Sequence, residues 1–95
     1  MNNDKTTVLE PIKTREERID DMVFDVVSTM NSVGYNAIDQ LAGYIMSEDP
    51  TYITAKEGCR IKIIEFDRLE ILDRILKKYI DTLTKENTTR NKEES

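Results

Sequence analysis

Hydrophobic residues recur with helical spacing through the middle of the chain. In the first such segment they lie three or four positions apart and mark one face of a helix over four turns, comprising Ile19, Met22, Val23, Val26, Val27, Met30 and Val33. Thr14 followed by Glu17 is typical of a capping box, and Gly34 suits a left-handed residue after the helix end. The pattern predicts a helix over about residues 15–33.

A second, shorter helix is predicted over about residues 37–47, with Asn36 as its cap. The same apolar spacing is kept by Ile38, Leu41, Ala42, Ile45 and Met46. Gly43 in its middle costs roughly 1 kcal/mol relative to Ala, so we expect a close contact with another helix as compensation. Pro50 ends this helix and favours a short helical turn through Ile53.

The last helical region is predicted over about residues 56–83, as one helix or as two. Asp67 with Glu70 three positions later resembles an N-cap, so a break near residues 66–68 is the alternative to one continuous helix. Two apolar stripes lie on this region: the first comprises Leu69, Leu72, Leu76, Tyr79 and Leu83, and the second Ile61, Ile64, Ile71 and Ile75.

Two apolar stripes on one region are more than two short neighbouring helices can cover. A two-fold partner would bury the surplus, so we expect an intertwined homodimer whose interface continues the core. The alternative is a monomer in which a break at Asp67 lets each half bury one stripe. The predicted fold class is all-α, with a compact domain of three to five helices at residues 15–83, a flexible N-terminal regulatory arm at 1–14 and a disordered polar tail at 84–95.

Composition argues against catalysis and metal binding. The 95 residues include no His, three Gly and one Cys. A His-based triad, a His-ligated metal site, an internal disulfide and a Gly-rich phosphate loop are therefore excluded. Cys59 is expected to be a small core residue. The sequence predicts no catalytic residue, no metal site, no cofactor and no enzymatic activity.

Charge and hydropathy bear on partners and location. With 14 Lys and Arg against 19 Asp and Glu, the net charge is -5, which argues against nucleic acid as a partner. The alternative of a small DNA-binding regulator is considered because the first two helices resemble a helix-turn-helix in outline. Its recognition helix would carry Asp39, Glu48 and Asp49 but no Lys or Arg. With no 18-residue apolar stretch and no apolar signal segment, a cytoplasmic protein without membrane insertion is expected.

The N-terminal arm places two hydroxyl groups, Thr6 and Thr7, in a polar segment that a kinase could reach without unfolding the domain. Phosphorylation would add a charge of roughly -1.5 to -2 and three strong acceptor oxygens. The arm is therefore a candidate for a charge switch.

Residues 34–53, GYNAIDQLAGYIMSEDPTYI, resemble the signature of the IreB-like regulatory phosphoproteins of Gram-positive bacteria. The resemblance covers about residues 20–82. Further downstream, residues match the family at fixed spacings, namely Arg60, Ile63, Arg68, Glu70, Ile71 and Tyr79. The sequence departs from the family pattern at Ala37, where Pro is usual, at Glu48, where Gly is usual, and at residues 54–55, where Pro-Arg is usual.

The resemblance implies an all-helical homodimer whose N-terminal Thr is phosphorylated by a membrane Ser/Thr kinase with cell-wall-sensing repeats and dephosphorylated by a partner phosphatase. Thr7 falls at the family's position, and Thr6 is its neighbour. In relatives the switch controls peptidoglycan synthesis and β-lactam tolerance, through proteolysis by a Clp protease of the enolpyruvyl transferase that begins precursor synthesis. We further expect Arg60 and Arg68 to bind the phosphate or a partner.

Overall fold

The computed structural model describes residues 12–94, with side chains through residue 87. The described chain is helical and contains no strand. Its elements are α2 (Arg15–Ser32), α3 (Ala37–Ser47), the 3-10 turns η1 (Pro50–Tyr52) and η2 (Lys56–Gly58), α4 (Cys59–Ile63) and α5 (Arg68–Glu94). The predicted all-α fold class is confirmed for these residues.

Helix α2 begins at the predicted capping box. The Thr14 hydroxyl accepts a hydrogen bond from the Glu17 amide at 3.1 Å, and the Glu17 carboxylate accepts one from the Thr14 amide at 2.9 Å. The helix ends at Ser32, one residue before the predicted end. Gly34 follows with a φ of 79°, the left-handed geometry for which the sequence indicated glycine.

Helix α3 has the predicted bounds, and the Asn36 side chain accepts a hydrogen bond from the Asp39 amide at 3.0 Å. The expected close contact at Gly43 is made by the aromatic ring of Tyr52 in the short 3-10 helix η1, and a Cβ atom at Gly43 would lie 2.3 Å from Tyr52 Cδ1. The glycine therefore lets the turn after α3 fold back onto that helix.

Of the two alternatives for the last helical region, the structure shows the one with a break near residue 67. Helix α4 ends at Ile63, and α5 begins at Arg68, after Asp67. The Asp67 carboxylate accepts a hydrogen bond from the Leu69 amide, and the Glu70 carboxylate accepts one from the Asp67 amide, both at 3.3 Å. The chain therefore changes direction between two helices that the apolar pattern alone could not separate.

The second predicted stripe was wrong because of this break. Ile63 and Ile71 are fully buried, whereas Ile61 and Ile64 are 69% and 51% exposed. One helical period cannot extend across residues 64–67, since they do not continue the helix. The face of α4 that packs inward is therefore one that a continuous helix would have placed outside.

One core holds α2, α3, α4 and the start of α5 together. Helix α2 contacts all three of the others. The core comprises Ile19, Met22, Val26 and Met30 from α2, with Tyr44, Ile53, Cys59, Ile63, Phe66 and Ile71 from the rest of the chain. Cys59 is fully buried, as expected for a small core residue.

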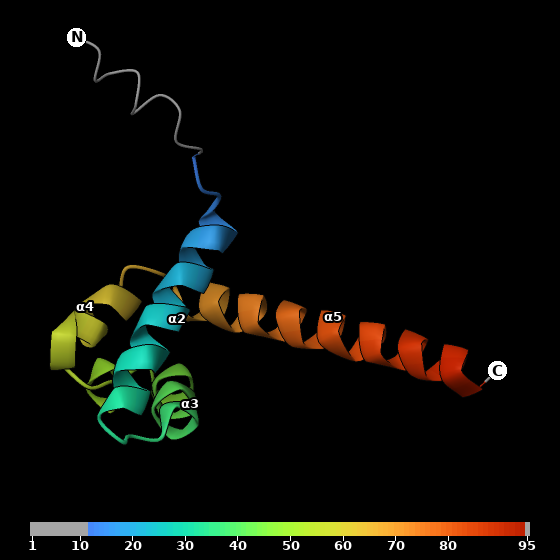
Figure 1. The fold of residues 1–95 in the computed structure, drawn as a ribbon. Coiled ribbons are helices and arrows are strands. Elements are labelled where there is room, and N and C mark those ends of the chain that lie inside the picture. Colours follow the sequence, from blue (N-terminus) through green and yellow to red (C-terminus); the bar gives the residue numbers. More distant parts are fainter. Residues whose placement is uncertain (1–11, 95) are drawn as a thin grey trace, which may run out of the picture.

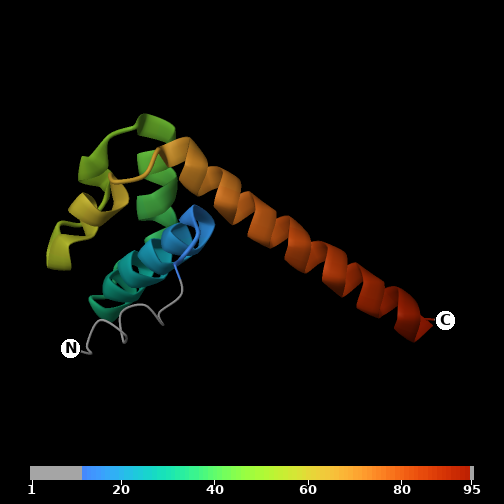
Figure 2. The same cartoon turned by 90° about the horizontal axis from the view of Figure 1, so that it is seen from above.

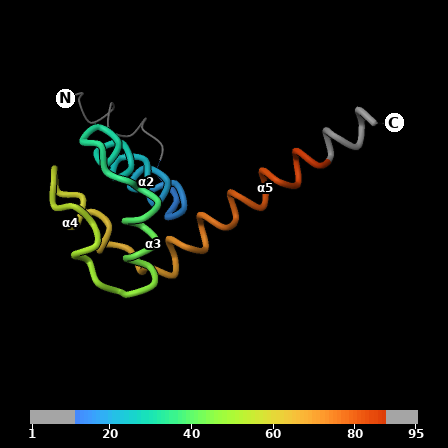
Figure 3. The backbone as a smooth tube through the Cα atoms, turned by 90° about the horizontal axis from the view of Figure 1, so that it is seen from below, coloured from blue at the N-terminus to red at the C-terminus, as the bar shows by residue number. Residues whose placement is uncertain are grey.

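Helix α5 packs against α2 and α3 near its start and then extends away from the other helices (Figures 1, 2 and 3). It continues to Glu94, although the sequence predicted a helix end near Leu83 and a disordered tail from residue 84. No Gly or Pro follows Leu83 in the sequence to end the helix, so its backbone hydrogen bonding can continue. Residues 1–11 of the predicted arm lie outside the described residues.

Candidate functional site

The side of the molecule where α3 meets α5 carries an apolar groove. It is lined by Ile38, Leu41, Ala42, Ile45 and Met46 of α3 and by Leu72 and Ile75 of α5. Ile38 and Met46 are 78% and 83% exposed. No charged side chain lines the groove, so its surface favours contact with another apolar surface over contact with water.

The groove continues along α5 as the first of the two predicted stripes. Leu69, Leu76, Tyr79 and Leu83 are all between 38% and 58% exposed, and Ile80 beside them is 54% exposed. The monomer alternative expected each half of the region to bury its own stripe, but the described chain leaves these side chains uncovered. We call the groove and this stripe together the apolar face.

The two arginines expected to bind a phosphate or partner both donate to backbone carbonyls. Arg60 Nε donates to the carbonyls of Pro50 at 3.1 Å and Ile53 at 2.9 Å. Arg68 Nη1 donates to the Ile45 carbonyl at 2.8 Å and its Nη2 pairs with Glu48. These contacts hold the end of α3 and the turn that follows. Both guanidinium groups therefore already have hydrogen-bond partners within the fold.

Thr6 and Thr7 lie outside the described residues. The described chain starts at Ile12, and the next residue, Lys13, forms an ion pair with Asp21 of α2. The entry to the arm therefore lies along the side of α2 that carries Asp21.

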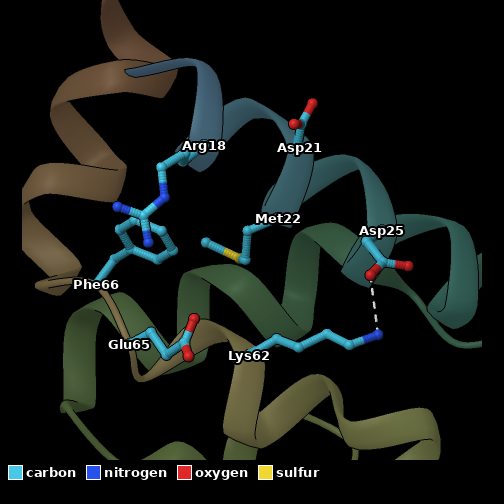
Figure 4. Close-up of a pocket in the computed structure, with 7 residues that line it drawn as sticks. All are labelled: Arg18, Asp21, Met22, Asp25, Lys62, Glu65 and Phe66. Atoms are coloured by element: carbon cyan, nitrogen blue, oxygen red, sulfur yellow. Dashed lines mark hydrogen bonds and ion pairs between the residues drawn. The ribbon is translucent and has the colours of Figure 1, made fainter. Parts of the chain in front are cut away.

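On that side, a hollow opens between α2 and α4 (Figure 4). It is lined by Arg18, Asp21, Met22, Asp25, Lys62, Glu65 and Phe66. Met22 and Phe66 are buried, and charged groups surround them. Sequence reasoning missed this hollow because Phe66 lies in the break between helices, where no apolar period marks it; the only available signal was the pair of arginines, Arg15 and Arg18, near the start of α2.

The hollow contains an ion pair between its two sides and an aromatic ring on which two cations stack. Lys62 Nζ donates to Asp25 Oδ2 at 2.9 Å, which raises the pKa of that lysine. The guanidinium of Arg18 lies over the Phe66 ring, 5.6 Å from its centre, and that of Arg15 lies over the same ring at 4.8 Å. The ring thus supports two cations at the start of α2.

Ion pairs between α2 and α5 fix the long helix in place. Arg74 donates to both carboxylate oxygens of Asp20, each at 2.8 Å, and these hydrogen bonds lower the pKa of Asp20. Arg15 likewise donates to both oxygens of Glu70 and lowers the pKa of that carboxyl. Both are two-point contacts, which set the angle between helices as well as their distance.

The described residues form neither a metal site nor a membrane-spanning helix. Among the described side chains, no three of His, Cys, Asp and Glu gather as they would around a metal ion. No helix of the described part is long and apolar enough to cross a bilayer.

The described chain is an all-helical scaffold with an exposed apolar face and a charged hollow beside its N-terminal entry. The family model of the IreB regulatory phosphoproteins matches residues 4–81. This match covers most of the chain, which therefore belongs to the IreB family. A regulatory role fits this family assignment.

The geometry of α3 does not support the DNA-binding alternative. The outer surface of α3 contributes to the apolar groove, and the helix carries no Lys or Arg. A recognition helix needs groups that hydrogen-bond to phosphates and base edges. This surface of α3 is suited to an apolar partner.

Proposed function

We propose that the protein is a non-catalytic regulator switched by phosphorylation of Thr7, with Thr6 as the neighbouring alternative. The observation that carries the proposal is the family match, which begins at residue 4 and so includes both threonines. A membrane Ser/Thr kinase adds the phosphate and a phosphatase removes it. The added charge, roughly -1.5 to -2, is large beside the net charge of -5 of the whole chain.

The working form is an intertwined homodimer. The apolar face supports this, because a chain of this size cannot cover it and a second copy carries the same face. A two-fold contact would bury each α5 stripe against α3 or α5 of the partner copy.

The downstream output is control of peptidoglycan synthesis and antibiotic tolerance. The family resemblance supports a cytoplasmic protein that governs Clp-dependent proteolysis of the enolpyruvyl transferase of precursor synthesis. Arg60 and Arg68 would contribute to partner recognition by fixing the shape of residues 45–53.

The test is phosphorylation of the full chain by the cognate kinase domain with ATP, followed by mapping of the phosphate by mass spectrometry. We expect label on Thr7 or Thr6 and its loss in the variant Thr6→Ala/Thr7→Ala. The variant Thr88→Ala/Thr89→Ala is the matched control, because it removes a second adjacent pair of threonines. Label that is absent from Thr6 and Thr7 while other residues are modified would refute the proposed switch.

A further inference from the structure

We propose that the hollow between α2 and α4 receives the phosphorylated N-terminal arm of the same chain, with Arg18 as the main phosphate ligand and Lys62 as the second. The inference rests on the proposed function, because it requires a phosphate on Thr7. It assigns the docking place to residues other than Arg60 and Arg68, whose guanidinium groups hold backbone carbonyls.

Arg18 differs from the other arginines whose side chains are described. The others each donate to a carboxylate or carbonyl oxygen: Arg15 to Glu70, Arg60 to Ile53, Arg68 to Ile45 and Arg74 to Asp20. The described contact of Arg18 is with the face of Phe66. A guanidinium on a ring is oriented while its N–H donors remain available, and its planar fork matches two phosphate oxygens.

Lys62 supplies a second cation from the opposite side of the hollow (Figure 4). Its present partner is Asp25, and the two side chains are 38% and 53% exposed. Exposed pairs of this kind contribute little, because water and salt screen them. A phosphate offers a denser negative charge and stronger acceptors, so Lys62 can exchange Asp25 for it.

The arm is long enough to return to this hollow. Thr14 lies seven positions after Thr7, a span of up to roughly 24 Å in extended chain. Arg18 lies only about 4.5 Å along the axis from the first residue of α2. The ion pair of Lys13 with Asp21 already directs the entry of the arm along this side of the helix.

The carboxylates of the hollow set the strength of the contact. Asp21 is paired with Lys13. Asp25 loses its partner when Lys62 turns to the phosphate, and Glu65 has no partner among the described side chains. Glu65 is exposed on the same rim and repels a phosphate. The structure therefore predicts opposite effects for two neighbours: loss of Arg18 weakens docking, and loss of the Glu65 charge strengthens it.

The test uses the full chain with phosphothreonine installed at position 7 by genetic encoding or peptide ligation, so that it does not depend on any kinase. The second pKa of the phosphate, ordinarily about 6, is measured by phosphorus NMR during a pH titration. We expect it to be lower in the folded chain than in the free peptide of residues 1–13 by roughly half a pH unit, because nearby cations favour the dianion. Arg18→Gln should bring the phosphate pKa most of the way back to the peptide value, and Glu65→Gln should lower it further.

Lys56→Gln is the control, since it removes one positive charge from a residue that does not line the hollow. It should leave most of the shift in place. Thermal melts show whether Arg18→Gln remains folded, and Glu65→Gln tests the same site through an exposed residue. A phosphate pKa equal to that of the peptide, raised above it by the carboxylates, or unaffected by both Arg18→Gln and Glu65→Gln would overturn the proposal. None of these results bears on whether the kinase modifies Thr7, which the mass-spectrometric assay decides separately.

Discussion

Gly43 shows how one residue shapes the turn that follows α3. Its missing side chain admits the ring of Tyr52, whose Cδ1 would be 2.3 Å from a Cβ at this position. The Ser47 hydroxyl donates to the Gly43 carbonyl at 2.6 Å and accepts a hydrogen bond from the Asp49 amide at 3.0 Å, which supports the same fold-back. The intrinsic cost of glycine in a helix is therefore offset by packing.

The variant Gly43→Ala should destabilise the protein by about 1–3 kcal/mol, because the new methyl group must displace the Tyr52 ring. Alanine would otherwise favour the helix by about 1 kcal/mol. Urea unfolding followed by circular dichroism measures the difference. In a Tyr52→Ala background the same change should become neutral or stabilising; an equal loss in both backgrounds would show that the ring is not the obstacle.

Burial was easier to predict from the sequence than hydrogen-bond partners, as Cys59, Arg60 and Arg68 show. The burial of Cys59 followed from its setting beside an apolar helix start, and it is fully buried. The two arginines were noted as cations, but their carbonyl partners lie 7 to 23 positions away in the chain. Contacts of this kind depend on how the turn at residues 48–53 folds, which no local period encodes.

At the scale of the helices, caps and apolar spacing were sufficient to predict α2 and α3. The capping box at Thr14 and the bounds of α3 are local properties, and both agree with the structure. The inward face of α4 was not predictable, because five residues show too little of a helical period and the break at residues 64–67 changes its phase. The sequence underestimates the extent of α5, because a segment without apolar residues, such as the one after Leu83, can still be helical.

The hollow could be predicted only in part, because its lining residues come from distant parts of the chain. Arg15 and Arg18 are visible in the sequence as a pair on one helix face, but the ring that supports them, Phe66, comes from the break about fifty residues later. By contrast, the first stripe on α5 was recognisable from its three- and four-residue spacing, and it forms part of the apolar face.

The two-point ion pairs between α2 and α5 make their packing sensitive to acid. The pKa values of Asp20 and Glu70 are lowered by the arginines that donate to them. Their contribution to stability is therefore fully present above the ordinary carboxyl pKa, roughly 4, and is lost as the pH falls through the lowered values in the folded chain.

The variant Asp20→Asn tests this coupling. It should reduce stability at pH 7 and should flatten the loss of stability between about pH 4 and pH 2, because the carboxyl that binds the proton on unfolding is gone. Asp73→Asn is the control, since it removes an exposed pair with Lys77 and should change stability at pH 7 by less than about 0.5 kcal/mol. Chemical unfolding at a series of pH values gives the stability of each variant at pH 7 and the steepness of its loss in acid. An acid limb as steep in Asp20→Asn as in the unmodified protein would contradict the assignment.

For the whole molecule, the decisive feature is the apolar face along α3 and α5. Side chains such as Met46 and Leu76 are 83% and 49% exposed in the single chain, and the long α5 extends away from the other helices. Clustered apolar side chains of this kind usually mark a contact surface. The proposed second copy would convert this exposed surface into a continuation of the core.

Substitutions on the apolar face should therefore affect association more than folding. Leu76→Glu and Met46→Glu would each bury a charge in the dimer contact and should raise the dimer dissociation constant at least about 100-fold. Ile61→Glu is the matched control, because Ile61 is 69% exposed on α4, outside the apolar face. It should leave association unchanged.

Sedimentation velocity of the full chain over a range of concentrations is the most direct test of this pairing. Pairing through the apolar face predicts a species of twice the 11.1 kDa mass of one chain, which dissociates in Leu76→Glu and persists in Ile61→Glu. A particle of 11.1 kDa at every concentration up to about 100 μM, well above micromolar affinity, would contradict it.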